Sequence, residues 1–138
     1  MPPFDSARFT LWLPQLLCAA FLAILFLQSG LDKVVDWKGN LGWLTGHFSK
    51  SPLKGVVTPM LAVITLMELA AGALSGAGAV ALLVNGSPLL AYLGAVLSAV
   101  SLLALFFGQR MAKEYAGAAV LVPYFIVALA GVYLMRLA

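Results

Sequence analysis

The chain has 138 residues, of which 63% are hydrophobic and only 9% are charged, too few charges to cover a soluble domain of this length. The composition therefore predicts an integral membrane protein and excludes a disordered chain, a secreted disulfide scaffold and a nucleic-acid-binding domain. The formal net charge of +3 is a small excess that fits the cationic loops of membrane proteins better than a phosphate-binding surface.

The first predicted element is a membrane-spanning helix over residues 10–31, inside a stretch without charged residues. The stretch is long enough to cross the hydrocarbon core of a bilayer and too long for the core of a signal peptide. Cys18 is the only cysteine of the chain, so no intrachain disulfide can form, and we expect a buried apolar side chain there.

Residues 32–58 form a polar and aromatic segment that is not an ordinary loop. Its apolar residues recur at helical spacing: Val34, Trp37, Leu41, Leu44 and Phe48. This pattern predicts a helix lying in the membrane interface, although Gly39, Gly42 and Gly46 argue against an uninterrupted one. The segment is an aromatic anchor without a ligand, a lid over a pocket between the helices, or a docking surface for a partner.

His47 is the only histidine, so we expect no metal or haem site built from this chain alone.

The second membrane-spanning helix is predicted over residues 59–84. Because residues 69–84 alone are too short to cross, this helix must extend back past Glu68, to a cap-and-proline start at Thr58-Pro59. An alternative ends the helix at Ser75-Gly76-Ala77-Gly78 and begins the third helix earlier.

A turn must divide residues 69–109, because this stretch carries no charge and is too long for a single pass. The turn is predicted at Asn85-Gly86-Ser87-Pro88, with Ser87 capping the next helix and Pro88 at its first position. We expect that third helix over residues 88–108.

A polar turn at residues 109–114 precedes the fourth predicted helix, residues 115–135, in which Pro123 should produce a kink. The predicted fold class is therefore all-α. We expect an integral membrane bundle of four transmembrane helices in a single domain, residues 1–138, with the interfacial segment between the first and second helices.

The lysines and arginines predict the orientation of this bundle. Only Arg8 and Arg136 lie on the membrane side of the termini. The other six lie in the first and third loops: Lys33, Lys38, Lys50, Lys54, Arg110 and Lys113. By the positive-inside bias, both loops are expected in the cytoplasm and both termini outside.

Glu68 is the most informative residue, because counting along its helix puts a carboxyl group near the middle of the bilayer. An ionisable group at that depth is costly and is a functional-site candidate by default. Gly72 and Gly76 follow on the same helix face and allow another helix to approach closely. We expect Glu68 to face packed protein and to be neutral, hydrogen-bonded or paired, in either a structural or a functional role.

A second polar group begins at Gln109, on the membrane side of the first loop. Arg110 is a candidate partner of Glu68 or Glu114, and Gln28, near the inner end of the first helix, could complete a polar pocket with Glu68. The alternative is an interfacial charge cluster that only sets the topology.

Three segments carry a family resemblance: Phe26-Leu27-Gln28-Ser29-Gly30-Leu31-Asp32-Lys33, Glu68-Leu69-Ala70-Ala71-Gly72, and Phe107-Gly108-Gln109-Arg110-Met111-Ala112-Lys113-Glu114-Tyr115-Ala116-Gly117. The first resembles the His-Gly-x-x-Lys end of helix one in the DoxX family, with Ser29 where the family has histidine. The second resembles its Glu-Leu-x-x-Gly, and the third a variant of some bacterial members. The similarity covers about residues 10–135.

This resemblance implies a small four-helix protein of the bacterial inner membrane. Relatives include the DoxD type of subunit of thiosulfate:quinone oxidoreductase and proteins associated with redox partners. Carried onto this sequence, the motifs support Lys33 and Glu68, whereas Ser29 weakens a ligand or proton-transfer role on the first helix.

The function predicted first is a non-catalytic accessory or anchoring subunit of a larger membrane redox complex, respiratory or photosynthetic. Its partners are the lipid bilayer and other membrane subunits, with no nucleic acid. The alternative is a membrane subunit of a quinone-linked oxidoreductase, in which a quinone or lipid headgroup contacts Gln28, Lys33, Glu68, Gln109 and Arg110. A weaker alternative is a small transporter or lipid-binding protein. We assign no catalytic or metal-ligating residue, and a quinone is the only cofactor considered.

Overall fold

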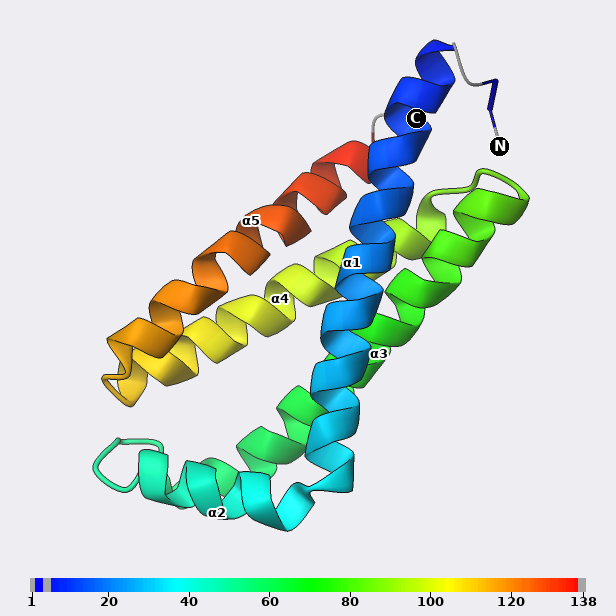
Figure 1. The fold of residues 1–138 in the computed structure, drawn as a ribbon. Coiled ribbons are helices and arrows are strands. Elements are labelled where there is room, and N and C mark those ends of the chain that lie inside the picture. The colour runs from blue at the N-terminus through cyan, green and yellow to red at the C-terminus, as the bar shows by residue number, and fades with distance from the viewer. Residues whose placement is uncertain (1, 4–5, 137–138) are drawn as a thin grey trace.

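A computed structural model describes residues 2–3 and 6–136, and every regular element in these ranges is a helix (Figure 1). In chain order the elements are α1 (Ala7–Val35), α2 (Trp37–His47), the short 3-10 helix η1 (Lys54–Val56), α3 (Val57–Val84), α4 (Leu89–Met111) and α5 (Tyr115–Arg136). The helices α1, α3, α4 and α5 are long and apolar enough to cross a membrane. The predicted all-α bundle of four spans is confirmed, and the chain is a multi-pass membrane protein.

α1 is longer than predicted at both ends. It begins at Ala7, where the Ser6 hydroxyl accepts a hydrogen bond from the Phe9 backbone N–H at 3.1 Å, and it ends at Val35 instead of residue 31. The prediction ends this helix at the first charged residues, but lysine is a good helix former and does not break a helix. The additional turn carries Lys33, whose charged end reaches a buried partner described below.

α3 begins at Val57, directly after η1, and no side chain caps its first turn. The predicted cap at Thr58 is therefore wrong, because the chain enters α3 already wound as a 3-10 helix. α3 continues without a break to Val84, so the alternative end at residues 75–78 is wrong as well. The glycines there are packed against neighbouring helices, and this packing offsets their poor intrinsic helix propensity.

The turn between α3 and α4 lies where the sequence predicted it. Gly86 has a φ of +73°, a left-handed conformation that glycine adopts without strain. The Ser87 backbone N–H donates to Asn85 Oδ1 at 2.9 Å, and α4 begins at Leu89 with no side-chain cap. The predicted Ser87 cap is wrong, because the Asn85 side chain organises this turn instead.

α2 runs without interruption from Trp37 to His47, so the prediction that its glycines break the helix is wrong. A glycine costs about 1 kcal/mol in a helix interior, which weakens a helix without breaking it. Phe48, directly after the helix, is buried at 6% exposure. α2 therefore lies across one end of the bundle as a continuous helix (Figure 1).

Small residues determine where the spans approach one another. A Cβ at Gly72 of α3 would lie 2.8 Å from the backbone nitrogen of Leu27 on α1, and a Cβ at Gly78 would overlap the backbone of Ala91 on α4. At Gly76 the nearest contact would be an ordinary 3.8 Å. The predicted close packing of the Gly72 face is confirmed, and the helix that it meets is α1 of the same chain.

α3 and α4 carry their small and large residues at opposite ends. Near their mutual turn both helices present glycine, alanine and serine, and a Cβ at Gly94 would meet Ser75. Toward α2 they present larger apolar side chains, including Met67 on α3 and Leu105 on α4. In Figure 1, α1 and α5 lie together near the termini and far apart at the end that carries α2. The four spans therefore diverge toward one end of the bundle, and α2 lies across that end.

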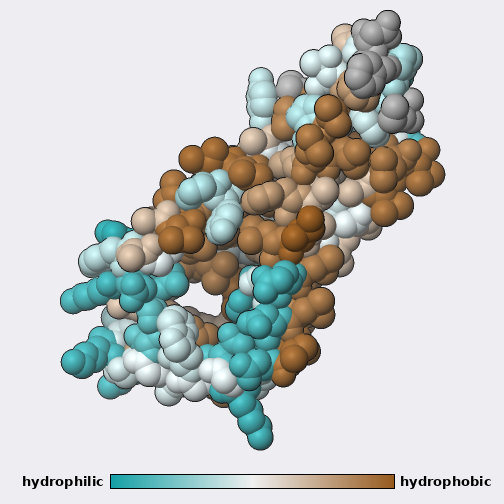
Figure 2. Space-filling view, in the orientation of Figure 1, coloured by the Kyte–Doolittle hydropathy of each residue, from teal (hydrophilic) through white to brown (hydrophobic). Residues whose placement is uncertain are grey.

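The outer surface of the spans is apolar, as contact with lipid requires. Leu66 on α3 is 68% exposed, in agreement with its predicted lipid-facing position. Figure 2 shows apolar residues over the middle of the molecule and hydrophilic residues gathered around α2 and the α4–α5 turn. Pro123 lies inside an α5 that continues on both sides of it, and its kink stays a prediction.

Gly72→Ala should destabilise the bundle, because the added methyl group would lie 2.8 Å from the Leu27 backbone nitrogen and α1 would have to move. Overpacking of this kind costs roughly 1–3 kcal/mol. Gly76→Ala is the matched control, since its methyl group would meet only a 3.8 Å contact. Thermal unfolding in mild detergent compares the two variants. A Gly72→Ala protein that unfolds at the same temperature as the parent would show that α1 and α3 are not in close contact there.

Candidate functional site

The first candidate site is a group of three polar side chains between α1 and α3, which we call the Glu68 cluster: Ser29, Lys33 and Glu68. Glu68 is only 1% exposed. The Ser29 hydroxyl donates a hydrogen bond to Glu68 Oε2 at 2.5 Å, and Lys33 Nζ lies 2.9 Å from Glu68 Oε1. Lys33 also donates to Ser29 Oγ at 3.0 Å, so each member of the cluster contacts the other two.

Helix geometry explains why these side chains meet. Ser29 and Lys33 are four residues apart on α1, so they lie on one face of the helix, one turn apart. Gly30 on α1 and Gly72 on α3 leave no room for a side chain where the two helices touch. The carboxylate of Glu68 is therefore held against the polar face of α1 by close backbone packing.

The cluster compensates a charge that apolar surroundings would otherwise exclude. An unpaired carboxylate there costs several kcal/mol. Lys33 neutralises Glu68 as an ion pair, although this contact lacks hydrogen-bond geometry and Glu68 Oε1 accepts no hydrogen bond from the described residues. The side chain of Lys33 is 17% exposed and that of Glu68 is 2% exposed. The ammonium thus lies at the edge of the cluster and the carboxylate at its buried end.

The predicted environment of Glu68 is confirmed, but its cation is not the predicted one. Arg110 is exposed at the end of α4, where its guanidinium lies 4.4 Å from the centroid of the Tyr115 ring. Among residues 2–3 and 6–136 the structure contains a single ion pair, and Lys33 supplies its cation. An α1 that ends at residue 31 would put Lys33 in a loop, which is why the sequence did not indicate this pairing.

The second candidate site is a cavity of about 650 Å³ between α2, α3 and α4, which we call the α2 cavity. It lies where α3 and α4 diverge, and Figure 2 shows a hollow between the hydrophilic surface of α2 and the end of α4. Its wall is mainly apolar and includes Met60, Ile64 and Met67 of α3 and Leu105 of α4. A volume of this size is typical of small-molecule sites.

The polar side chains that line the α2 cavity come from α2 and from the ends of α1 and α4 beside it, and we call this side of the cavity its polar end. They are Lys33 of α1, Asn40 and His47 of α2, and Gln109 of α4. His47 Nε2 lies 3.0 Å from Gln109 Oε1 and so connects α2 to α4, and Trp43 stacks on His47 with ring centroids 4.5 Å apart. None of the described residues that line the cavity is an aspartate or a glutamate.

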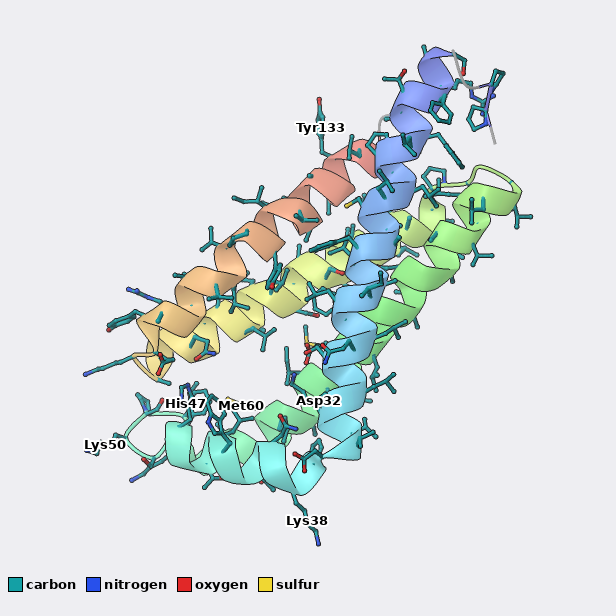
Figure 3. All side chains as sticks on the ribbon, viewed as in Figure 1. Asp32, Lys38, His47, Lys50, Met60 and Tyr133 are labelled. Atoms are coloured by element: carbon teal, nitrogen blue, oxygen red, sulfur yellow. The ribbon has the colours of Figure 1, made fainter. Side chains whose placement is uncertain are left out.

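The other lysines of the α2 region do not belong to this site. In Figure 3, Lys38 and Lys50 extend away from the bundle, whereas His47 lies on the side of α2 that faces α4. The cationic side chain that lines the cavity is Lys33, and its countercharge lies behind it in the Glu68 cluster.

The structure brings together three of the five predicted site residues. Lys33 and Gln109 line the α2 cavity, and Glu68 lies behind Lys33 without lining it. Gln28 is exposed on α1 because it precedes the cluster by one residue, about 100° around the helix. Gln28 therefore does not complete a pocket with Glu68. Arg110 is also exposed and does not line the α2 cavity.

Two features of the site were missed from the sequence. Against the family pattern Ser29 looks like the loss of a polar ligand, yet it forms hydrogen bonds with both charged members of the cluster. Its four-residue spacing from Lys33 is the signal that could have indicated this. No local spacing could show that His47 meets Gln109, because 62 positions separate them in the chain.

Comparisons with protein-family models, with curated proteins and with solved structures find no match. The resemblance to the DoxX family therefore stays a prediction that depends on the quoted sequence segments. Within residues 2–3 and 6–136, no three His, Cys, Asp or Glu side chains are grouped so as to hold a metal ion.

Glu68→Ala should lower the stability of the bundle by about 1–3 kcal/mol, because the buried polar groups of the cluster lose their partner. Glu68→Gln should be tolerated better, since its amide oxygen can still accept the Ser29 hydrogen bond at unchanged side-chain size. Thermal unfolding in mild detergent measures both. If the alanine variant unfolds like the parent, the Glu68 cluster does not stabilise the fold.

Proposed function

We propose that this chain is the quinone-binding membrane subunit of a larger redox assembly of the DoxX kind. The observation that carries this proposal is the α2 cavity, with its apolar wall and its polar end free of carboxylates. A quinone has a matching division, with a head that bears uncharged carbonyl acceptors and an apolar tail. In this proposal the chain supplies the site, and a partner subunit exchanges electrons with the bound quinone.

The polar end of the cavity supplies donors for the carbonyl groups of the head. The ammonium of Lys33 and the amide groups of Asn40 and Gln109 all carry N–H donors, and all three residues line the cavity. The flat indole of Trp43, stacked on His47, offers an aromatic surface beside them.

The apolar tail of a quinone has a way into the bilayer. Val63 of α3 and Phe107 of α4 both line the cavity, yet each is 56% exposed on the outer surface of the spans. The cavity therefore opens toward lipid between the diverging halves of α3 and α4. A tail longer than the cavity can extend through this opening among the lipid chains.

Of the two redox interpretations of the sequence, the cavity favours the quinone-binding subunit over a purely anchoring one. The small-residue face that suggested packing against another subunit is occupied by α1 within this chain. The carboxylate that suggested transport is held by Ser29 and Lys33. Neither the anchoring role nor transport gains a separate supporting observation.

The proposed location is the bacterial inner membrane, with α2 and the α4–α5 turn on the cytoplasmic side. Figure 1 supports the grouping, since both lie at the end of the bundle opposite the termini. This end carries six of the eight lysine and arginine residues. The positive-inside bias then assigns it to the cytoplasm.

Gln109→Leu should weaken the binding of decylubiquinone to the purified chain about threefold to tenfold, the effect of losing one hydrogen bond in an apolar site. Gln28→Leu is the matched control, because Gln28 is exposed on α1 and does not line the cavity. Quenching of tryptophan fluorescence on titration with the quinone measures both affinities. A parent chain that does not bind decylubiquinone, or equal losses in the two variants, would contradict the proposed site.

Cysteine labelling tests the orientation. In a Cys18→Ala background, a membrane-impermeant thiol reagent added to intact cells should label Ser87→Cys, in the α3–α4 turn, and not Ser49→Cys, which is exposed just after α2. Both cysteines should react after the cells are opened. Labelling of Ser49→Cys in intact cells would reverse the assignment.

A further inference from the structure

Lys33 belongs to both candidate sites, the Glu68 cluster and the α2 cavity. Its side chain lines the α2 cavity, and its ammonium is 2.9 Å from Glu68 Oε1 and 3.0 Å from Ser29 Oγ. Glu68 is fully enclosed and lines no part of the cavity. The cavity therefore faces a cation whose countercharge is out of reach of any ligand.

The contacts of Lys33 leave it able to bind a ligand. An ammonium group has three N–H donors, and among the described residues only Ser29 accepts a hydrogen bond from this one. The contact with Glu68 is an ion pair without hydrogen-bond geometry. A lysine side chain is flexible, but these two contacts fix the position of this ammonium and leave N–H groups for an acceptor in the cavity.

We propose that the Lys33–Glu68 pair makes the α2 cavity selective for an uncharged headgroup with carbonyl acceptors over an anionic one. This inference rests on the proposed function and names the class of headgroup that the site accepts. Lys33 donates a hydrogen bond to the ligand. Glu68 is a positioning residue that acts through Lys33 and never touches the ligand.

Charge balance explains the selectivity. The polar end of the cavity contains no carboxylate of its own, so without Glu68 the Lys33 charge would attract fatty acids and other anionic amphiphiles. With Glu68 paired behind it, an incoming carboxylate meets repulsion from Glu68 as well as attraction to Lys33 in surroundings of low dielectric constant. A carbonyl oxygen needs only an N–H donor, and the pairing does not remove it.

Binding of two amphiphiles to the purified full chain in mild detergent tests this. Decylubiquinone is the uncharged probe and dodecanoate the anionic one. The parent chain should bind decylubiquinone the more tightly. Glu68→Gln should raise the affinity for dodecanoate about tenfold, because this variant removes the repulsion between Glu68 and the carboxylate of the ligand. Its affinity for decylubiquinone should change much less.

Glu114→Gln is the matched control. Glu114 is exposed in the turn between α4 and α5 and does not line the cavity, so this substitution removes the same formal charge outside the site. This variant should keep the parent's ratio of the two affinities. A Glu68→Gln protein that binds decylubiquinone with an unchanged ratio overturns the inference and leaves the proposed function intact. A parent chain that binds dodecanoate more tightly overturns the inference as well, and one that binds neither probe overturns both.

A double variant guards against a Glu68→Gln protein that does not fold. Lys33→Met with Glu68→Met replaces the ion pair by apolar side chains of similar length, a change that buried pairs often tolerate without loss of stability. Such a protein should unfold near the parent's temperature and yet bind decylubiquinone about tenfold or more weakly, as expected from the loss of a charged donor. Unchanged decylubiquinone binding in the folded double variant would overturn the inference.

Discussion

The ion pair between Glu68 and Lys33 is the constraint on which the rest of the structure depends. A carboxylate buried among apolar helices needs a countercharge, and the nearest cation lies beyond the apolar part of α1. α1 must therefore continue as a helix past Asp32, so that Lys33 lies one turn from Ser29 and can pair with Glu68. Glycines on both helices bring the backbones close enough for these contacts, which fixes α1 against α3 at the end of the bundle that carries α2.

The α2 cavity follows from how α3 and α4 are packed around this fixed pair. Glycine, alanine and serine let them touch near their mutual turn, whereas Met67, Leu105 and other large side chains separate them at the opposite end. α2 covers the gap and is connected to α4 by the contact of His47 with Gln109. The apolar wall and the opening toward lipid thus arise from the distribution of side-chain size along α3 and α4, and the polar end comes from α2 and the helix ends beside it.

Much of this fold could be predicted from the sequence, because bilayer thickness turns charge-free lengths into helices. The four spans, the turn at Gly86 and the burial of Glu68 all depend on local composition and counting. The site could be predicted only in part. The extension of α1 past its first charged residues depends on the pairing of Lys33 with Glu68, 35 positions away in the chain. The contact of His47 with Gln109 depends on how α2, α3 and α4 pack together. Such tertiary contacts leave no signal in local spacing.

Photolabelling tests the central claim, a quinone held in the α2 cavity, most directly. The full chain in lipid nanodiscs would be irradiated with an azidoquinone and digested, and the modified residues would be located by mass spectrometry. The account predicts label on residues that line the cavity, in α2, the first half of α3 and the last turns of α4, and competition by unlabelled decylubiquinone. Label spread over the lipid-facing surface of α5, with no competition, would contradict it.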